Sequence, residues 1–260
     1  MIIKKIDNSI TVAKAKSGYY PLRLNIYLYI ADGVLIDAGS ANIMREIKSL
    51  LREQNISCAA ITHVHEDHTG AAAWIKNNLN VPVYLSANSI PEAALKSDIP
   101  LYRRLTWGNR EGFAAEPMPP FIETGRLRLD VIDAPGHHRD HVVFHEKNRG
   151  WLFTGDLYVS RKQIVAFKDE NINEAINSLD RLLKLDFDTI FCAHSGVHNN
   201  GKEKLKSKLD FFIDIRGKVS ELEKAGLTRK EIDKRIYPKT NPWSIISRGE
   251  WSTLHVIETI

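Results

Sequence analysis

A dense run of metal-binding side chains lies between residues 62 and 70. It reads Thr-His-Val-His-Glu-Asp-His-Thr-Gly and places His63, His65, Asp67 and His68 close together in the chain. Buried imidazoles and carboxylates need partners, so such a run has little use in an apolar core. The run suits a pair of divalent metal ions, because two nitrogens can bind one ion while a carboxylate and another nitrogen bind the second. The run therefore predicts a metal centre.

Other candidate ligands each follow an apolar, strand-like segment and stand beside a glycine. They are His137 in Ala-Pro-Gly-His, Asp156 in Phe-Thr-Gly-Asp and His194 in Cys-Ala-His-Ser-Gly. The histidine run has the same setting, since it begins where the apolar segment 59–62 ends. Loops held by a rigid sheet are common places for catalytic groups. One such site is weak evidence, but four in this order indicate a single composite centre.

The order of these four sites resembles the metallo-β-lactamase superfamily of metal-dependent hydrolases. The resemblance covers roughly residues 1–200, and Asp37-Ala-Gly39 after the first hairpin also fits it. It implies an α/β fold, a four-layer αβ/βα sandwich with the metals at the edges of its two sheets. It also implies the ligand sets: His63, His65 and His137 for a first metal, and Asp67, His68 and His194 for a second, with Asp156 bridging both.

The chemistry that this resemblance implies is hydrolysis. Two metal ions about 3.5–4 Å apart can share a water and lower its pKa towards about 7. The metal-bridging hydroxide would attack a small thioester, lactone or other ester, and Asp67 would both bind a metal and orient the hydroxide. The donors suit two Zn²⁺ ions, although their types also fit Fe or Mn. A glutamate in place of His65 would resemble the superfamily's oxygen-reducing di-iron branch, so hydrolysis is favoured.

Residues beside the expected ligands are candidates for supporting roles. His138 adjoins His137 and could replace it as a ligand; it stands where superfamily members usually carry a small hydroxyl residue. His141 matches a histidine that often orients ligands in the superfamily. Tyr158 could reach the substrate oxygen or belong to the core. The other histidines are expected to be surface or structural residues: His145, His198 and His255.

The sequence also allows functions other than hydrolysis of a small ester. The segment Phe191-Cys-Ala-His194 resembles the last ligand segment of glyoxalase II, but a glutathione-binding pattern is not evident. The helical tail resembles the small winged-helix appendage of β-lactamase-like endoribonucleases, and residues 201–240 hold 12 Lys and Arg against 7 Asp and Glu. A phosphodiesterase or ribonuclease acting on RNA is therefore one alternative, with residues 102–107 as a further contact. A non-catalytic metal-bound module is the other.

Composition and charge narrow the class of protein. The 260 residues are 43% hydrophobic, and 36 basic residues against 32 acidic ones give a net charge of +4, too mild to imply nucleic acid alone. No apolar run reaches the roughly 18 residues that would span a membrane. The first residues show no apolar signal segment, and Cys58 and Cys192 make no disulfide framework. We expect a cytoplasmic protein without a membrane partner.

The hydrophobic pattern predicts alternating strands and helices. A hairpin is expected over 24–36, turning at Asp32-Gly33. Amphipathic helices are expected over 41–54, 70–78 and 172–183. Short strands are expected over 59–62, 81–86, 127–132, 141–145, 151–154 and 189–192. We predict a catalytic domain over 1–200, a partly helical insertion near the active site over 89–123, and a helical C-terminal module over 201–260 with a helix capped by Thr228.

Overall fold

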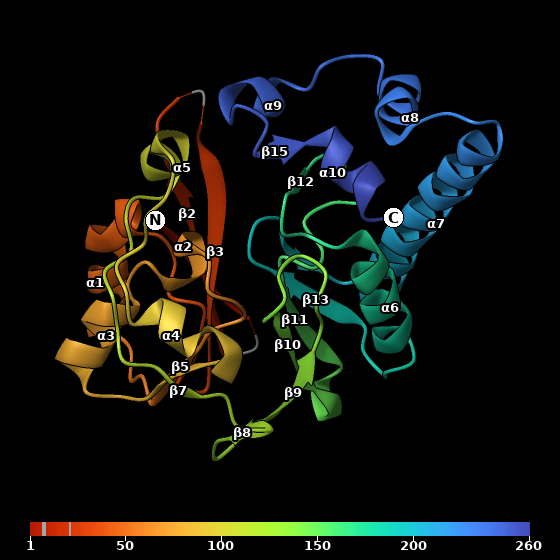
Figure 1. Ribbon diagram of the computed structural model, residues 1–260. Helices are drawn as coiled ribbons and strands as arrows, with labels where there is room; N and C mark the ends of the chain where they lie inside the picture. The colour runs from red at the N-terminus through yellow and green to blue at the C-terminus, as the bar shows by residue number, and fades with distance from the viewer. Residues whose placement is uncertain (7–8, 21) are drawn as a thin grey trace.

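Two β-sheets lie face to face with helices outside each of them in the computed structural model, which describes residues 1–6, 9–20 and 22–260 (Figure 1). In this described part of the chain the first sheet has the order β1 (Ile2–Ile6), β2 (Ile10–Ser17), β3 (Leu24–Ala31), β4 (Val34–Ile36), β5 (Cys58–Ala60), β6 (Val83–Leu85) and β7 (Glu116–Pro117). Pairing is antiparallel from β1 to β4 and parallel from β4 to β7. The predicted hairpin is β3–β4.

The second sheet is mostly antiparallel. Its order is β14 (Gly196–His198), β13 (Thr189–Cys192), β11 (Trp151–Gly155), β10 (Val142–Glu146), β9 (Arg128–Asp133) and β8 (Phe121–Glu123). Among the described pairs of this sheet, β11–β13 alone is parallel. A small sheet joins β12 (Ala166–Phe167) to β15 (Trp251–Ser252).

Helices cover the outer faces of both sheets (Figure 1). The outer layer of the first sheet contains α1 (Met44–Arg52) and α3 (Ala72–Leu79), and that of the second contains α6 (Ile172–Leu182) and α7 (Gly201–Lys224). The shorter helices are α2 (Glu66–Thr69), α4 (Ile90–Ala93), α5 (Leu101–Thr106), α8 (Arg229–Ile236), α9 (Pro242–Ile246) and α10 (Thr253–Glu258). Within the described ranges, no helix has both the length and the apolar character needed to cross a membrane.

Separate hydrophobic clusters fill the spaces between these layers. Ile47 and Leu50 of α1 pack with Leu35 on the outer face of the first sheet. Tyr29, Phe153 and Phe191 meet between the sheets, where the two phenylalanine rings stack with centroids 4.5 Å apart. A third cluster lies between the second sheet and its helices. The predicted four-layer α/β sandwich is confirmed, and its buried faces fix where each strand ends.

The tail after residue 200 is helical, as predicted, but it shares a hydrophobic core with the second sheet. Val256 and Ile257 of α10 are fully buried in the same cluster as Ile176 of α6 and Phe212 of α7. The Thr228 capping box is present at the start of α8. The tail then crosses over the two halves and brings α9 near α5 (Figure 1). The division of the chain at residue 200 and a winged-helix character of the tail stay predictions.

The segment 89–123 is partly helical, as expected. It contains α4 and α5 and ends in β7 and β8, which lie at the edges of the first and second sheet respectively. Its end therefore connects the two halves of the sandwich. Its helical part lies near the tail, because Trp107 just after α5 contacts Trp251 with ring centroids 6.3 Å apart.

Candidate metal centre

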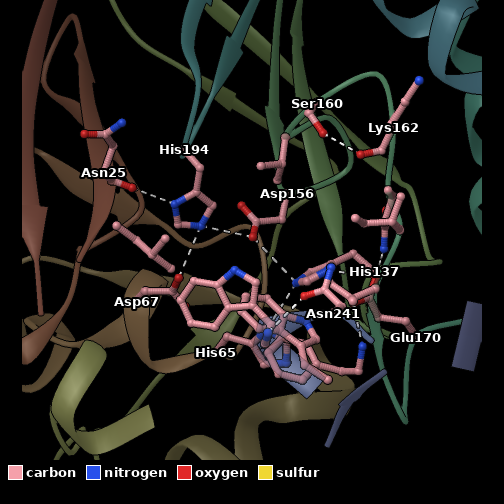
Figure 2. Close-up of a pocket in the computed structure, with 18 of the residues that line it drawn as sticks. Asn25, His65, Asp67, His137, Asp156, Ser160, Lys162, Glu170, His194 and Asn241 are labelled. Atoms are coloured by element: carbon pink, nitrogen blue, oxygen red, sulfur yellow. Dashed lines mark hydrogen bonds and ion pairs between the residues drawn. The ribbon is translucent and has the colours of Figure 1, made fainter. Parts of the chain in front are cut away.

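The predicted ligands come from loops at strand ends in both sheets and meet between them. The loop after β5 carries the histidine run, and the turn after β9 carries His137. The turns after β11 and β13 carry Asp156 and His194. Figure 2 shows His65, Asp67, His137, Asp156 and His194 pointing towards one another at one wall of a pocket.

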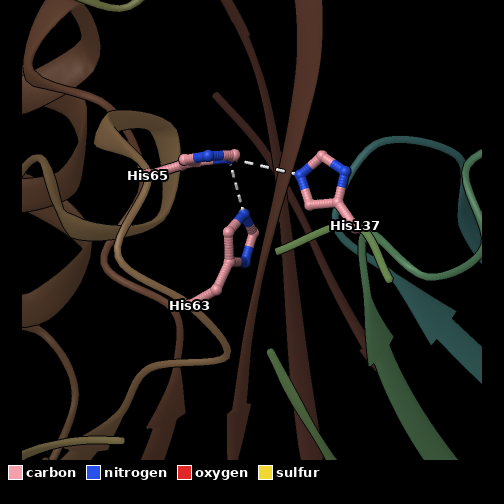
Figure 3. Close-up of side chains that lie close together, drawn as sticks. All are labelled: His63, His65 and His137. Atoms are coloured by element: carbon pink, nitrogen blue, oxygen red, sulfur yellow. Dashed lines mark hydrogen bonds between the residues drawn. The ribbon is translucent and has the colours of Figure 1, made fainter. Parts of the chain in front are cut away.

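One group of possible ligands is made of three imidazoles, His63, His65 and His137. Nε2 of His63 lies 3.0 Å from Nδ1 of His65, and Nε2 of His137 lies 3.2 Å from the same atom (Figure 3). Two nitrogens on one tetrahedral zinc, each about 2.0–2.1 Å from the metal, stand about 3.3 Å apart. The spacing of these nitrogens therefore fits a shared metal ion.

The second group mixes carboxylates and imidazoles: Asp67, His68, Asp156 and His194. Nε2 of His194 lies 3.2 Å from Oδ2 of Asp67 and 3.1 Å from Oδ2 of Asp156. Nε2 of His68 lies 3.4 Å from Oδ1 of Asp156. Oδ2 of Asp156 is also 3.7 Å from Nε2 of His137 in the first group. Asp156 thus lies between the two groups, where a bridging carboxylate would be placed.

Buried atoms without a hydrogen-bond partner support the fit of a metal to these residues. Nε2 of His68 and Oδ1 of Asp156 are both inaccessible to water and both lack a partner that meets hydrogen-bond geometry. Buried polar atoms are rarely left unpaired, because the loss of hydration costs about 1–3 kcal/mol each. Since the two atoms face each other, a cation between them would satisfy both.

Burial and neighbouring charges set the protonation of the cluster. Burial, together with the nearby His68 and His65, holds the pKa of His63 well below its ordinary value. Burial opposes the charge on His194, but Asp156 and Asp67 outweigh it and raise that pKa well above the ordinary value. Burial likewise opposes ionisation of Asp156, yet His194 and His68 hold its pKa well below the usual range. His63 is therefore neutral and Asp156 ionised at neutral pH, as metal ligands must be, whereas His194 holds a proton that a metal would displace.

Outer partners hold the imidazoles with one nitrogen towards the centre. Nδ1 of His68 contacts Oδ2 of Asp37 at 2.8 Å, and Nδ1 of His194 donates to the backbone carbonyl of Asn25 at 2.8 Å. Nδ1 of His137 lies 3.3 Å from Oε2 of Glu170. Such contacts fix the tautomer of a ligating histidine. The sequence pattern indicated Asp37 but missed Glu170 and the Asn25 carbonyl, because neither is part of a motif.

His141 supports the loop that carries Asp156, in line with the orienting role expected for it. Its Nε2 accepts a hydrogen bond from the backbone N–H of Asp156 at 3.1 Å, and burial lowers its pKa to about 3. Gly155 has a positive φ of 49°, and a Cβ there would lie 2.6 Å from that same Nε2. The glycine beside the ligand therefore permits the close approach of His141.

The other candidate residues lie at different distances from the centre. His138 pairs with Asp140 through Nδ1 and stands 3.6 Å from Asp169 through Nε2. With His65 and Asp169 it forms a further possible ligand group, while His137 belongs to the group with His63 and His65, so His138 stays a candidate ligand. Tyr158 is buried against the ring of His198, within the core of the second half. His145 and His255 bond the backbone carbonyls of Asp186 and Ala166. Cys58 and Cys192 are buried free thiols.

The centre opens into a cavity of about 630 Å³. Three segments far apart in the chain wall it: Trp107 after α5, Ile164–Phe167 of the second half, and Trp243 and Trp251 of the tail. The rings of Phe167 and Trp251 stack with centroids 4.8 Å apart. The candidate metal-binding groups therefore face a cavity whose lining is mostly apolar by area.

Arg103 ties these walls to the metal-binding run. Its Nη2 lies 2.6 Å from Oε2 of Glu66, which sits between His65 and Asp67 in the chain, and its Nη1 lies 3.1 Å from Oε1 of Glu250 in the tail. The guanidinium of Arg103 is thus committed to two carboxylates, whereas Arg104 is exposed. Residues 102–107 were expected to offer a further contact to RNA; of the two arginines in this segment, Arg103 is already paired within the fold and Arg104 is not buried.

We predict that Asp37→Asn weakens metal binding about 10- to 100-fold, as loss of an outer partner does in other metal sites. The new amide N–H₂ faces Nδ1 of His68 and drives its proton to Nε2, so the nitrogen that points into the centre is no longer a free donor. Competition with a fluorescent chelator measures the affinity. Glu116→Gln, which alters an exposed pair with Lys76, is the control; equal affinities of Asp37→Asn and wild type would contradict the role of Asp37.

Comparisons with known proteins agree with this fold. The family model described as the metallo-beta-lactamase superfamily matches residues 20–194. The chain belongs to the metallo-beta-lactamase superfamily, a superfamily of metal-dependent hydrolases. A metallo-beta-lactamase family protein from Thermus thermophilus has a similar structure, with a TM-score of 0.64, 20% identity, and coverage of 95% of this chain and 90% of that one.

Two similar relatives carry the same description of activity. The hydroxyacylglutathione hydrolase of Nitrosomonas europaea is 30% identical over 64% of this chain, which spans 56% of that relative's length. The hydroxyacylglutathione hydrolase GloC of Haemophilus influenzae is 26% identical over 66% of this chain and 84% of its own. The superfamily match over residues 20–194 includes the histidine run at 62–70, and the tail after residue 200 lies outside it.

Proposed function

We propose that the protein is a dinuclear metal-dependent hydrolase that cleaves a small thioester, with lactones and other esters as further substrates. The observation that carries this proposal is the pair of candidate ligand groups, with Asp156 between them, at the wall of a largely apolar cavity. The thioester class is supported by the relatives described as hydroxyacylglutathione hydrolases.

Each of the two candidate ligand groups would hold one metal ion. His63, His65 and His137 would hold one ion. Asp67, His68 and His194 would hold the other, with Asp156 shared between them. Four-coordinate sites of imidazole and carboxylate with an open position are typical of catalytic zinc. We therefore propose zinc for both positions, and elemental analysis of the purified protein tests this choice.

The residues of the chain orient the reaction. When bound, the two ions supply a hydroxide at neutral pH and polarise the carbonyl oxygen of the substrate. Asp67 has one carboxylate oxygen 3.2 Å from His194, and its other oxygen can accept the proton of the attacking water. Asp156 keeps the two groups at a fixed separation. The aromatic wall holds the body of the substrate and keeps bulk water away from the thiolate that leaves.

The RNA-cleaving alternative gains no support from the basic tail. Lys206 and Lys218 of α7 pair with Asp210 and Asp214 on the same helix, at 2.5 Å and 2.7 Å. Carboxylates four residues away reduce the positive field that a phosphate backbone would meet. The alternative stays a prediction, and cleavage of RNA by the metal-loaded protein would establish it.

A panel assay tests the proposed function. We expect zinc-loaded protein to hydrolyse acyl thioesters with kcat/KM of about 10⁴ M⁻¹s⁻¹ or more, in the ordinary range of enzymes. Lactones should be slower, and the protein stripped of metal should be inactive until zinc is restored. Protein that binds two equivalents of zinc yet turns over no thioester, lactone or ester in the panel would contradict the proposal.

A further inference from the structure

A buried lysine lines the same chamber without a carboxylate partner. Lys208 lies on α7 and is 2% exposed, and it is one of the residues that line the cavity next to the metal-binding groups. Its ammonium lies 5.4 Å from the centroid of the Phe212 ring. Among the described residues, Lys208 has neither an ion pair nor a hydrogen bond through its side chain.

Such a residue destabilises the empty protein. Lysine is almost never fully buried unless it is paired, because its ammonium loses hydration on burial. Burial lowers the pKa of Lys208 to about 8, opposed by the field of Glu170. The ammonium is therefore still mostly charged at neutral pH. A buried, unpaired charge beside the cavity has a physical explanation if a bound anionic ligand pairs with it.

Glu170 is the carboxylate that raises the pKa of Lys208 most, but it is not the missing partner, because its oxygens are already engaged. Oε1 of Glu170 accepts the backbone N–H of Phe167 at 2.9 Å, and Oε2 accepts from Nε2 of Gln163 at 2.6 Å. The same Oε2 lies 3.3 Å from Nδ1 of His137. Glu170 thus supports a metal-binding histidine, and Lys208 has no competing intramolecular anion within ion-pair distance in the described chain.

The other cations of the chamber are unavailable. Arg103 is held by Glu66 and Glu250. Lys162 is exposed, and Figure 2 shows its ammonium pointing away from the metal-binding residues. Among the described residues that line the cavity, Lys208 is therefore the buried cation left to receive a ligand. One ammonium without a second cation suits a single negative charge better than a phosphate dianion.

We propose that the substrate carries one carboxylate, which pairs with Lys208 while its scissile carbonyl lies at the metal-binding groups. The apolar walls, including Ile164, Val165 and Trp243, cover the carbon chain between these two ends. The substrate class is thus a monothioester or monoester of a dicarboxylic acid. This inference rests on the proposed function for the reaction, but the binding of the carboxylate is tested without turnover.

The activity test compares matched substrates on wild type, Lys208→Met and Lys208→Gln. Each pair has the same neutral thiol, N-acetylcysteamine, and an acyl chain that ends in either a carboxylate or a methyl group, from succinyl to adipyl. For the best chain length we expect wild type to prefer the carboxylate by about 10- to 100-fold, the range for a hydrogen bond to a charged group. Both variants should lose this preference, whereas Lys206→Met on the exposed face of α7 should keep it.

A binding test separates failure of this inference from failure of the proposed function. The non-hydrolysable ketones 5-oxohexanoate, which ends in a carboxylate, and 2-hexanone, which ends in a methyl group, are titrated calorimetrically into zinc-loaded wild type and both Lys208 variants. We expect 5-oxohexanoate to bind wild type about tenfold or more tightly than the variants, and 2-hexanone to show no such difference. Equal affinity of all three proteins for 5-oxohexanoate would overturn the role of Lys208, even if thioesters are hydrolysed. Weaker binding by the variants would sustain it, even if no thioester is cleaved.

Discussion

Asp156→Ala should lose metal and activity together. Asp156 lies between the two ligand groups, 3.1 Å from Nε2 of His194, 3.4 Å from Nε2 of His68 and 3.7 Å from Nε2 of His137. Its removal leaves both groups one donor short and leaves buried imidazoles without a counter-charge. Metal catalysis supplies several kcal/mol, and each 1.36 kcal/mol is a factor of ten. We expect kcat/KM to fall by about 10³-fold or more.

Metal content and rate are measured on the same preparation of this variant. Elemental analysis should give clearly fewer than two zinc ions for each chain, and added zinc should not restore the rate. Asp188→Ala, just before β13 and away from the cavity lining, is a matched control that keeps both properties. A variant of Asp156 with two zinc ions and a reduced rate would show that this carboxylate acts on the substrate rather than as a shared ligand.

Lys208→Met should stabilise the metal-free protein at pH 7. Burial lowers the pKa of Lys208 from its ordinary 10.5 to about 8, against the raising effects of Glu170, Cys192 and Asp156. A pKa difference of this size corresponds to about 3 kcal/mol of unfolding free energy. Methionine has a similar length and no charge, so it removes the penalty and still fills the space beside Phe212. The gain should approach that value at pH 7.

The stability advantage of Lys208→Met over wild type should depend on pH in a definite direction. Below about pH 8 both the folded and the unfolded protein hold the proton of Lys208, so the full penalty is present. Between about pH 8 and 10.5 the unfolded chain holds the proton and the folded chain releases it, so wild type gains stability as the pH rises. The advantage of Lys208→Met in urea unfolding should therefore shrink over this interval. An advantage that is absent at pH 7, or that grows with pH, would contradict the prediction.

The fold was predictable because its pattern is local. The hairpin at Asp32-Gly33, the helix capped by Thr228 and the short apolar strands each leave a signal within a few residues. Element ends were less certain: the helix expected over 41–54 begins as a 3₁₀ turn, Ala41–Ile43, and continues as α1. The end of the segment 89–123 supplies an edge strand to each of the two sheets. This role depends on pairing with strands far away in the sequence, so the local pattern did not reveal it.

The sequence by itself identified the seven residues proposed as metal ligands and the order in which strands present them. It did so because each donor stands in a short motif of apolar strand, turn and glycine, as at Gly155-Asp156. Only the tertiary structure decided what surrounds them: Glu170 behind His137, the ring of Trp251 over the cavity, and Lys208 in its wall. These contacts join segments far apart in the chain, so no local spacing encodes them. The tail packs against both halves and lines the cavity, so we expect it to influence which substrates reach the proposed metal centre.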